Sequence, residues 1–159
     1  MDIQIIAVGK IKEPYLRQGI QEYTKRLTPY CKLSIIELHD EKAPERLSSE
    51  QQNNIKHKEA ERIVRAQRPG AFTIALAIQG KSYTSESFAQ TVDKLGINGT
   101  SSIDFIIGGS LGLDESILSS ADLLLSFSSF TFPHQLMRLI LLEQIYRAYK
   151  IMHGEPYHK

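Results

Sequence analysis

The chain has 159 residues, a formal net charge of +1 at pH 7 and a single cysteine, Cys31. One cysteine excludes an internal disulfide and a cysteine metal cluster, and a charge so close to zero provides no global field that attracts nucleic acid. The length fits one domain over residues 1–159. No apolar stretch approaches a membrane span and the first residues carry no signal-peptide pattern, so we expect a cytoplasmic protein.

The beginning of the chain is predicted to form a strand, a helix and a second strand. The β-branched run Ile3 to Val8 predicts a strand that ends at Gly9. Glu13 to Tyr30 has the apolar spacing of a helix. Leu33 to Leu38 is the second predicted strand.

Basic and tyrosine side chains are concentrated between Lys10 and Lys32, where the only acids are Glu13 and Glu22. Such a surface suits RNA, but basic helix faces are more often only solvated. Both interpretations stay open on the sequence alone.

A charged loop and a polar helix follow. The segment His39 to Glu50 is predicted to be a surface loop, and Ser48 or Ser49 can cap a helix that runs from there to about Arg68. Apolar residues are sparse in this helix, so we expect it on the outside of the molecule.

Three short apolar runs without alternation are predicted to be strands: Phe72 to Ile78, Ile103 to Ile107 and Leu123 to Phe127. This pattern is typical of strands buried on both faces of a parallel sheet that helices cover. Helices are expected between them, at Ser85 to Leu95 and, capped by Asp114, at Glu115 to Ser120. The sequence therefore predicts an α/β fold with a mainly parallel sheet flanked by helices.

Two of these strands end at loops that suit a ligand. The strand Ile103 to Ile107 is followed by Gly108-Gly109-Ser110-Leu111-Gly112. The strand Leu123 to Phe127 is followed by Ser128-Ser129-Phe130-Thr131. In parallel sheets, ligands bind beyond the carboxyl ends of the strands. Glycine lets backbone amides approach a ligand closely. We therefore expect both loops to form walls of one pocket.

The chain ends in a long, mostly apolar helix. Pro133 lies near its first position, with Thr131 or Phe132 as the expected cap. Polar residues occupy only one narrow strip of the helix, formed by Glu143, Arg147 and Lys150. We therefore expect it to face both its own sheet and a partner chain.

Four ionisable or aromatic side chains near the end of the chain are candidates for chemistry. His134 and Arg138 lie four residues apart and project from the same side of the helix. Arg138 either pairs across a dimer interface or contacts a ligand. The terminal segment, with Tyr157 and His158, is either frayed or folds over a site.

Common catalytic and cofactor motifs are absent. The glycine loop has neither P-loop spacing nor the dinucleotide fingerprint, the histidines lack metal-ligand spacing, and no G-x-S-x-G motif occurs. A pocket of backbone amides, glycines and apolar side chains suits an adenosine-bearing cofactor that supplies its own reactivity.

Four segments of the sequence resemble the bacterial ribosomal RNA large-subunit methyltransferase H family, which belongs to the SPOUT class. They are VGKIKEPY (8–15), IIGGSLGL (106–113), SFSSFTFPHQLMRLILLEQIYRA (126–148) and the terminal PYHK (156–159). The similarity extends over nearly the whole chain, and its Phe-Pro-His-Gln-Leu-Met-Arg motif is highly specific.

The resemblance implies a SPOUT α/β knot with a C-terminal deep trefoil knot. It implies that S-adenosylmethionine binds in the knot, at positions matching Leu76, Gly108, Phe127, Ser128, Ser129, Phe130, Thr131 and Phe132. It also implies an obligate homodimer that methylates N3 of a pseudouridine in 23S rRNA on the assembled 70S ribosome, without a membrane or DNA partner.

Within that family chemistry, methyl transfer to the imide nitrogen needs in-line positioning and one base. His134, Tyr157 and His158 are candidates for the base or for stacking on the target base, and Arg138 for holding a phosphate or the uracil carbonyls. Two alternatives remain on the sequence: a SPOUT methyltransferase of tRNA, and a non-enzymatic dimer that binds RNA or ribosomes.

Overall fold

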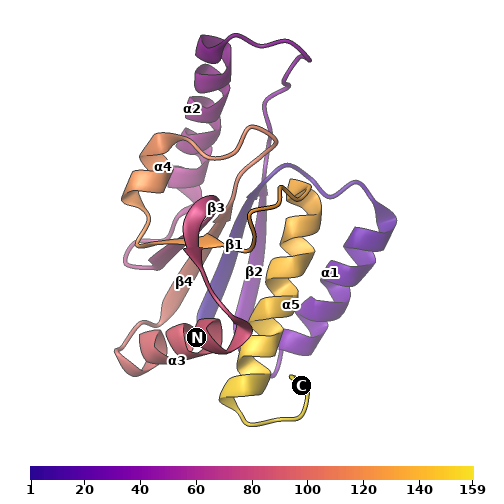
Figure 1. The fold of residues 1–159 in the computed structure, drawn as a ribbon, viewed down its shortest axis with the longest axis vertical. Helices are drawn as coiled ribbons and strands as arrows, with labels where there is room; N and C mark the ends of the chain where they lie inside the picture. Colours follow the sequence, from indigo (N-terminus) through magenta and orange to yellow (C-terminus); the bar gives the residue numbers. More distant parts are fainter.

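The computed structural model describes residues 1–159, in which strands and helices alternate along the whole chain (Figure 1). The strands are β1 (Asp2–Val8), β2 (Lys32–Leu38), β3 (Phe72–Ser82), β4 (Ser102–Ile107) and β5 (Leu123–Ser126). The helices are α1 (Pro14–Leu27), α2 (Ser49–Ala66), α3 (Ser85–Ile97), α4 (Glu115–Ser120) and α5 (His134–Met152). No helix is both long and apolar enough to cross a membrane.

All five strands form one parallel sheet in the order β2-β1-β4-β3-β5. In the central strands β1 and β4 nearly every residue is buried, as the apolar runs without alternation predicted. Because the strands are parallel, the loops after β3, β4 and β5 reach the same edge of the sheet.

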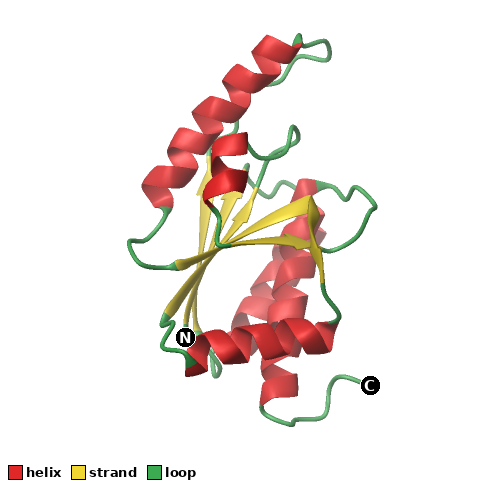
Figure 2. Ribbon diagram, turned by 60° about the vertical axis from the view of Figure 1, so that its left-hand side comes forward, coloured by secondary structure: helices red, strands yellow, loops and turns green.

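Helices cover both faces of the sheet, and each face has its own apolar core (Figure 2). On one face, alternate residues of β1 and β4, such as Ile5 and Phe105, pack with α1, α3 and α5. On the other face, their neighbours Ile6 and Ile106 pack with α2 and α4. The parallel sheet covered by helices is therefore confirmed.

Several predicted details are also confirmed. Ser48 caps α2 in a reciprocal capping box with Gln51, and Asp114 caps α4 by accepting from the Ser116 N–H. The helix α2 buries only Glu59, Ala60 and Ile63, so it lies on the outside as expected.

Two element boundaries differ most from the prediction. The helix α1 ends at Leu27 rather than Tyr30, because residues 28–30, with Pro29 in the middle, form a turn. The strand β3 continues to Ser82 through an irregular segment between Leu76 and Lys81. Gly80 permits this path, since a Cβ there would lie 2.7 Å from the Leu124 backbone.

The predicted caps of α5 are wrong. Pro133 is its N-cap residue, with an extended ψ of 131°, and neither Thr131 nor Phe132 caps the helix with its side chain. At the start of α5, the Met137 N–H donates the first backbone hydrogen bond of the helix to the Pro133 carbonyl, at 3.0 Å. The amides of the first turn are therefore left without intrachain partners.

The helix α5 lies between α1 and α3 against the sheet, and none of its residues is fully exposed. Its two-sided burial thus arises partly within one chain. Contact with a second chain, and the trefoil knot implied by the resemblance, stay predictions.

Candidate active site

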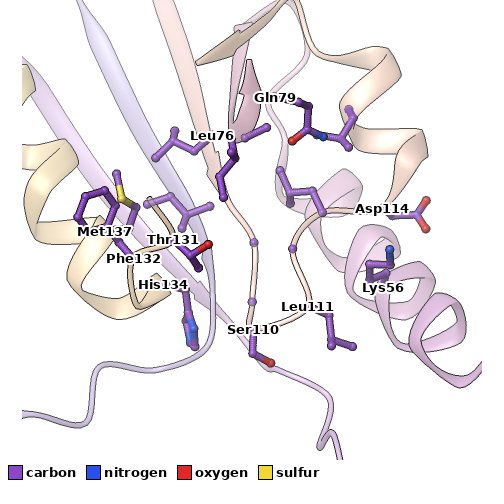
Figure 3. Close-up of a pocket in the computed structure, with 18 of the residues that line it drawn as sticks. Lys56, Leu76, Gln79, Ser110, Leu111, Asp114, Thr131, Phe132, His134 and Met137 are labelled. Carbon is purple, nitrogen blue, oxygen red and sulfur yellow. The ribbon is translucent and has the colours of Figure 1, made fainter. Parts of the chain in front are cut away.

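A cleft of about 1250 Å³ lies at the carboxyl ends of β3, β4 and β5. Its walls come from residues 76–79 of β3, the glycine loop 108–112, and the loop 127–133 that leads into α5. In Figure 3 the glycine loop runs through the middle, with Phe132, His134 and Met137 on one side and Lys56 and Asp114 on the other. The two loops predicted to form one pocket do so.

The glycine loop is a tight turn that only glycine can form at two positions. A Cβ on Gly108 would lie 2.9 Å from the backbone carbon of Gly112, closer than real side chains approach. Gly112 has a φ of +84°, and its N–H donates to the Gly109 carbonyl at 3.1 Å. The loop therefore folds back on itself and presents backbone to the cleft.

The loop 127–132 presents free amides and exposed aromatic rings. The Phe130 N–H donates to the Ser128 hydroxyl at 3.0 Å, and the other amides of residues 128–132 have no partner within the chain. Phe130 is 78% exposed and Phe132 is 37% exposed. Unpartnered backbone donors beside apolar rings are suited to hold a polar heteroaromatic ligand.

Most residues predicted to bind the cofactor line this cleft. They are Leu76, Gly108, Phe127, Ser128, Phe130, Thr131 and Phe132. Ser129 belongs to the same loop but does not line the cleft itself. These residues come from three strand ends, so the parallel sheet brings them together.

His134 lines the cleft at the first residue of α5. Its ring lies against Gly9, where a Cβ would be 3.5 Å from Nε2, and Gly9 has a φ of +95°. Burial, followed by the positive charge of Arg138, lowers the pKa of His134, although Asp40 opposes the shift. The imidazole is therefore neutral near pH 7 and able to accept a proton.

Arg138 does not line the cleft. Its side chain is 1% exposed, pairs with the Glu37 carboxylate at 2.6 Å, and donates to the Gly9 carbonyl at 2.9 Å. The same Glu37 oxygen accepts from the Ile11 N–H at 2.9 Å. Arg138 thus joins α5 to the ends of β1 and β2, directly behind His134.

Tyr157 and His158 contact other residues of the same chain, away from the cleft. The Tyr157 hydroxyl donates to Glu143 at 3.0 Å, and Arg147 lies over the tyrosine ring at 4.6 Å. His158 Nε2 is 2.6 Å from Glu86 of α3. Nine residues of helix, roughly 13 Å, separate Glu143 from the cleft end of α5. The terminal segment is therefore docked in this structure rather than frayed.

One wall of the cleft was not predicted from the sequence. Asn53, Lys56 and His57 of α2 line it, and His57 Nδ1 is 3.1 Å from the Asp114 carboxylate. The polar pattern of α2 indicated only a solvated helix. The contact depends on how α2 packs beside α4, which residue spacing does not reveal.

Comparison with known proteins agrees with this geometry. Residues 1–158 match a family model described as "Predicted SPOUT methyltransferase". Proteins named ribosomal RNA large subunit methyltransferase H are 63% identical in Bifidobacterium adolescentis, 60% in Bacillus pumilus and 59% in Clostridioides difficile. Each alignment covers 100% of both chains. The chain belongs to the ribosomal RNA large subunit methyltransferase H family. As a member of this family it is a methyltransferase.

Solved structures support the SPOUT fold of this methyltransferase H family member. A methylase family protein from Haemophilus influenzae matches with a TM-score of 0.55 at 12% identity, over 99% of this chain and 70% of that one. A methyltransferase from Legionella pneumophila, solved with bound SAM, matches with a TM-score of 0.51 at 13% identity, over 93% of this chain and 66% of that one. At such low identity these two comparisons concern the fold alone.

Proposed function

We propose that this chain transfers a methyl group from S-adenosylmethionine to N3 of pseudouridine 1915 in 23S rRNA, on the assembled ribosome in the cytoplasm. The observation that carries the proposal is the 59% to 63% identity, over all 159 residues, to three proteins named as large-subunit rRNA methyltransferases. The cleft adds independent support, since its chemistry suits both the cofactor and an extruded base.

The residues of the cleft fit S-adenosylmethionine. Apolar side chains such as Leu76 and Leu125 offer contacts for an adenine ring, and the free amides of Ser128, Thr131 and Phe132 offer donors to its nitrogens. A cleft of about 1250 Å³ exceeds the roughly 300–1,000 Å³ of ordinary small-molecule sites. It therefore has room for a nucleoside beside the cofactor.

When bound, S-adenosylmethionine supplies a sulfonium methyl group that an attacking nitrogen can accept in line. The residues of this chain have two tasks in that reaction. The glycine loop and the loop 127–132 hold the two reactants in fixed orientation, which is the largest contribution expected for such a transfer. Neutral His134 removes the imide proton of the target base, so that N3 carries the electron pair that forms the new bond.

The buried Arg138 is proposed to position this base rather than to touch the RNA. Its guanidinium is occupied by Glu37 and Gly9, and Gly9 lies against the His134 ring. Tyr157 and His158 remain alternative bases, because a tail released from Glu143 and Glu86, or the tail of a partner chain, can approach a cleft.

We also propose a homodimer. The apolar side chains of Leu136, Met137 and Ile140 are partly exposed on the first half of α5 and do not join either core. Phe132 and Phe130, just before the helix, extend this apolar surface. A second copy would cover it and give α5 the second buried face that its sequence indicates.

The experiment that tests this function is transfer of labelled methyl from S-adenosylmethionine to assembled ribosomes, free large subunits and bulk tRNA, side by side. Label on the RNA of assembled ribosomes is expected. Label on tRNA alone would show that the substrate is tRNA, with methyl transfer from S-adenosylmethionine still the reaction. Cofactor binding without any transfer, on all three substrates, would favour a non-enzymatic RNA or ribosome binder.

A further inference from the structure

The structure divides the basic, tyrosine-rich segment 10–32 into two parts with different surroundings. At the far end, Arg26 pairs with Glu22 at 3.0 Å and lies over the Tyr23 ring at 5.1 Å. The Tyr30 hydroxyl donates to Glu155 of the terminal segment at 2.7 Å. These side chains are already occupied by their own chain, so they offer little to a partner.

The near end is free. Lys10 and Lys12 are exposed and make no ion pair, and Tyr15 is 65% exposed with no aromatic or hydrogen-bonding partner. We name Lys10, Lys12 and Tyr15 the cleft lip. The acid among them, Glu13, leaves a net charge of +1 from two lysines and one glutamate.

The loop between β1 and α1, which carries Lys10 and Lys12, passes beside the start of α5 (Figure 1). The Lys12 N–H donates to Gln135 of α5 at 3.2 Å, one residue after His134. The Ile11 carbonyl accepts from Arg17 at 3.0 Å. Together with the bonds of Arg138 and Glu37 to this turn, these contacts hold the backbone of the turn in place near His134.

A target base imposes a condition on the RNA next to it. N3 lies on the pairing edge of a uracil ring, so a paired nucleotide cannot present it, and the target must be unpaired and turned out. Its neighbours on the strand then lose a stacking partner. A protein surface beside the site gains affinity by offering cations to the backbone and an aromatic ring to a base.

We propose that the cleft lip binds the single-stranded RNA next to the methylated nucleotide, with Lys10 and Lys12 on backbone phosphates and Tyr15 stacked on a neighbouring base. This inference rests on the proposed function, because it assigns the RNA-contacting surface of that same site. A ribosomal protein is the competing partner, and a small surface with two unpaired cations and one free ring matches a nucleic-acid strand better.

The test compares Tyr15→Ala, Tyr15→Phe and the double variant Lys10→Gln/Lys12→Gln with the unchanged chain, on ribosomes that lack the modification. Tyr15→Ala is expected to raise KM for ribosomes roughly 5- to 150-fold, the range of one lost stacking contact, with kcat nearly unchanged. Tyr15→Phe retains the ring and is expected to behave as the unchanged chain. In the double variant, the slope of log KM against the logarithm of the salt concentration is expected to fall by about 1.4, because two phosphate contacts are lost.

Two controls separate this inference from a general loss of charge or fold. The double variant Lys25→Gln/Lys94→Gln removes two exposed lysines away from the cleft and is expected to leave KM unchanged. Affinity for S-adenosylmethionine, measured by calorimetry, is expected to be equal in all variants.

The outcomes distinguish the inference from the proposed function. No methylation of ribosomes by the unchanged chain would refute the proposed function itself. Normal methylation with KM unaffected by the lip variants would refute only the inference. A photo-crosslinking residue at position 15 that labels 23S rRNA supports it, whereas one that labels a ribosomal protein overturns the assignment to RNA.

Discussion

At the scale of single residues, the proposed base is one histidine, His134, whose neutral form is favoured by its surroundings. His134 has a lowered pKa because it is partly buried and lies near Arg138. The folded state thus disfavours the imidazolium. Neutral His134 contributes stability that is fully present above the unfolded pKa of about 6.5 and is lost as pH falls from that value through the lower folded pKa. The same shift keeps the base available in weak acid.

We predict that the acidic limb of the pH profile of kcat/KM lies below the ordinary histidine value of about 6.5. His134→Ala is expected to lower kcat roughly 10²- to 10⁴-fold while affinity for S-adenosylmethionine is retained. A variant ending at Pro156 serves as the comparison, since it removes Tyr157 and His158. Full turnover by His134→Ala, with loss of turnover in the shortened chain, would indicate that Tyr157 or His158 is the base instead of His134.

Arg138 should matter to stability more than any exposed cation. Arg138→Met is expected to cost about 2–4 kcal/mol of unfolding free energy in a urea titration, less than a fully buried pair because Glu37 is 38% exposed. Arg26→Met, which breaks the exposed pair with Glu22, is the control and should leave the midpoint unchanged. Equal effects of the two variants would show that the contacts of Arg138 with Glu37 and Gly9 contribute no more to stability than an exposed ion pair does.

At the scale of elements, the glycine loop after β4 makes a testable demand on backbone shape. Gly108→Ala places a methyl group 2.9 Å from the Gly112 backbone, so the loop must move. We predict at least a roughly tenfold loss of affinity for S-adenosylmethionine, which corresponds to a loss of about 1.4 kcal/mol of binding free energy. Gly96→Ala in α3 meets only a flexible methionine end at 3.6 Å, and its affinity should be unchanged.

The sequence predicted strands and loops better than helix ends and tertiary contacts. Apolar runs such as Ile103 to Ile107 are buried on both faces, a property that composition alone reveals. The extension of β3 beyond Ile78 depends on Gly80 passing close to Leu124, a long-range contact without a local signal. For the same reason the sequence indicated that Arg138 was special but could not show that Glu37 and Gly9 occupy it.

At the scale of the whole molecule, the proposed dimer follows from the apolar surface at the start of α5. We predict that sedimentation of the unchanged chain gives twice the 18.0 kDa chain mass. Ile140→Asp is expected to give monomers with an unchanged circular dichroism spectrum. Ile97→Asp is the control, because Ile97 is exposed at the end of α3, away from this surface, and the dimer should persist. A monomeric unchanged chain would contradict the proposal.

The proposed reaction is tested by locating the methyl group that this protein adds to 23S rRNA. Ribosomes that lack the modification are treated with this protein and S-adenosylmethionine, and the nucleosides of the extracted 23S rRNA are mapped by mass spectrometry and primer extension. The proposed function predicts one added methyl group on pseudouridine 1915, with a block to primer extension because N3 lies on the pairing edge. A methyl group on another nucleotide, or on this one without a block, would contradict it.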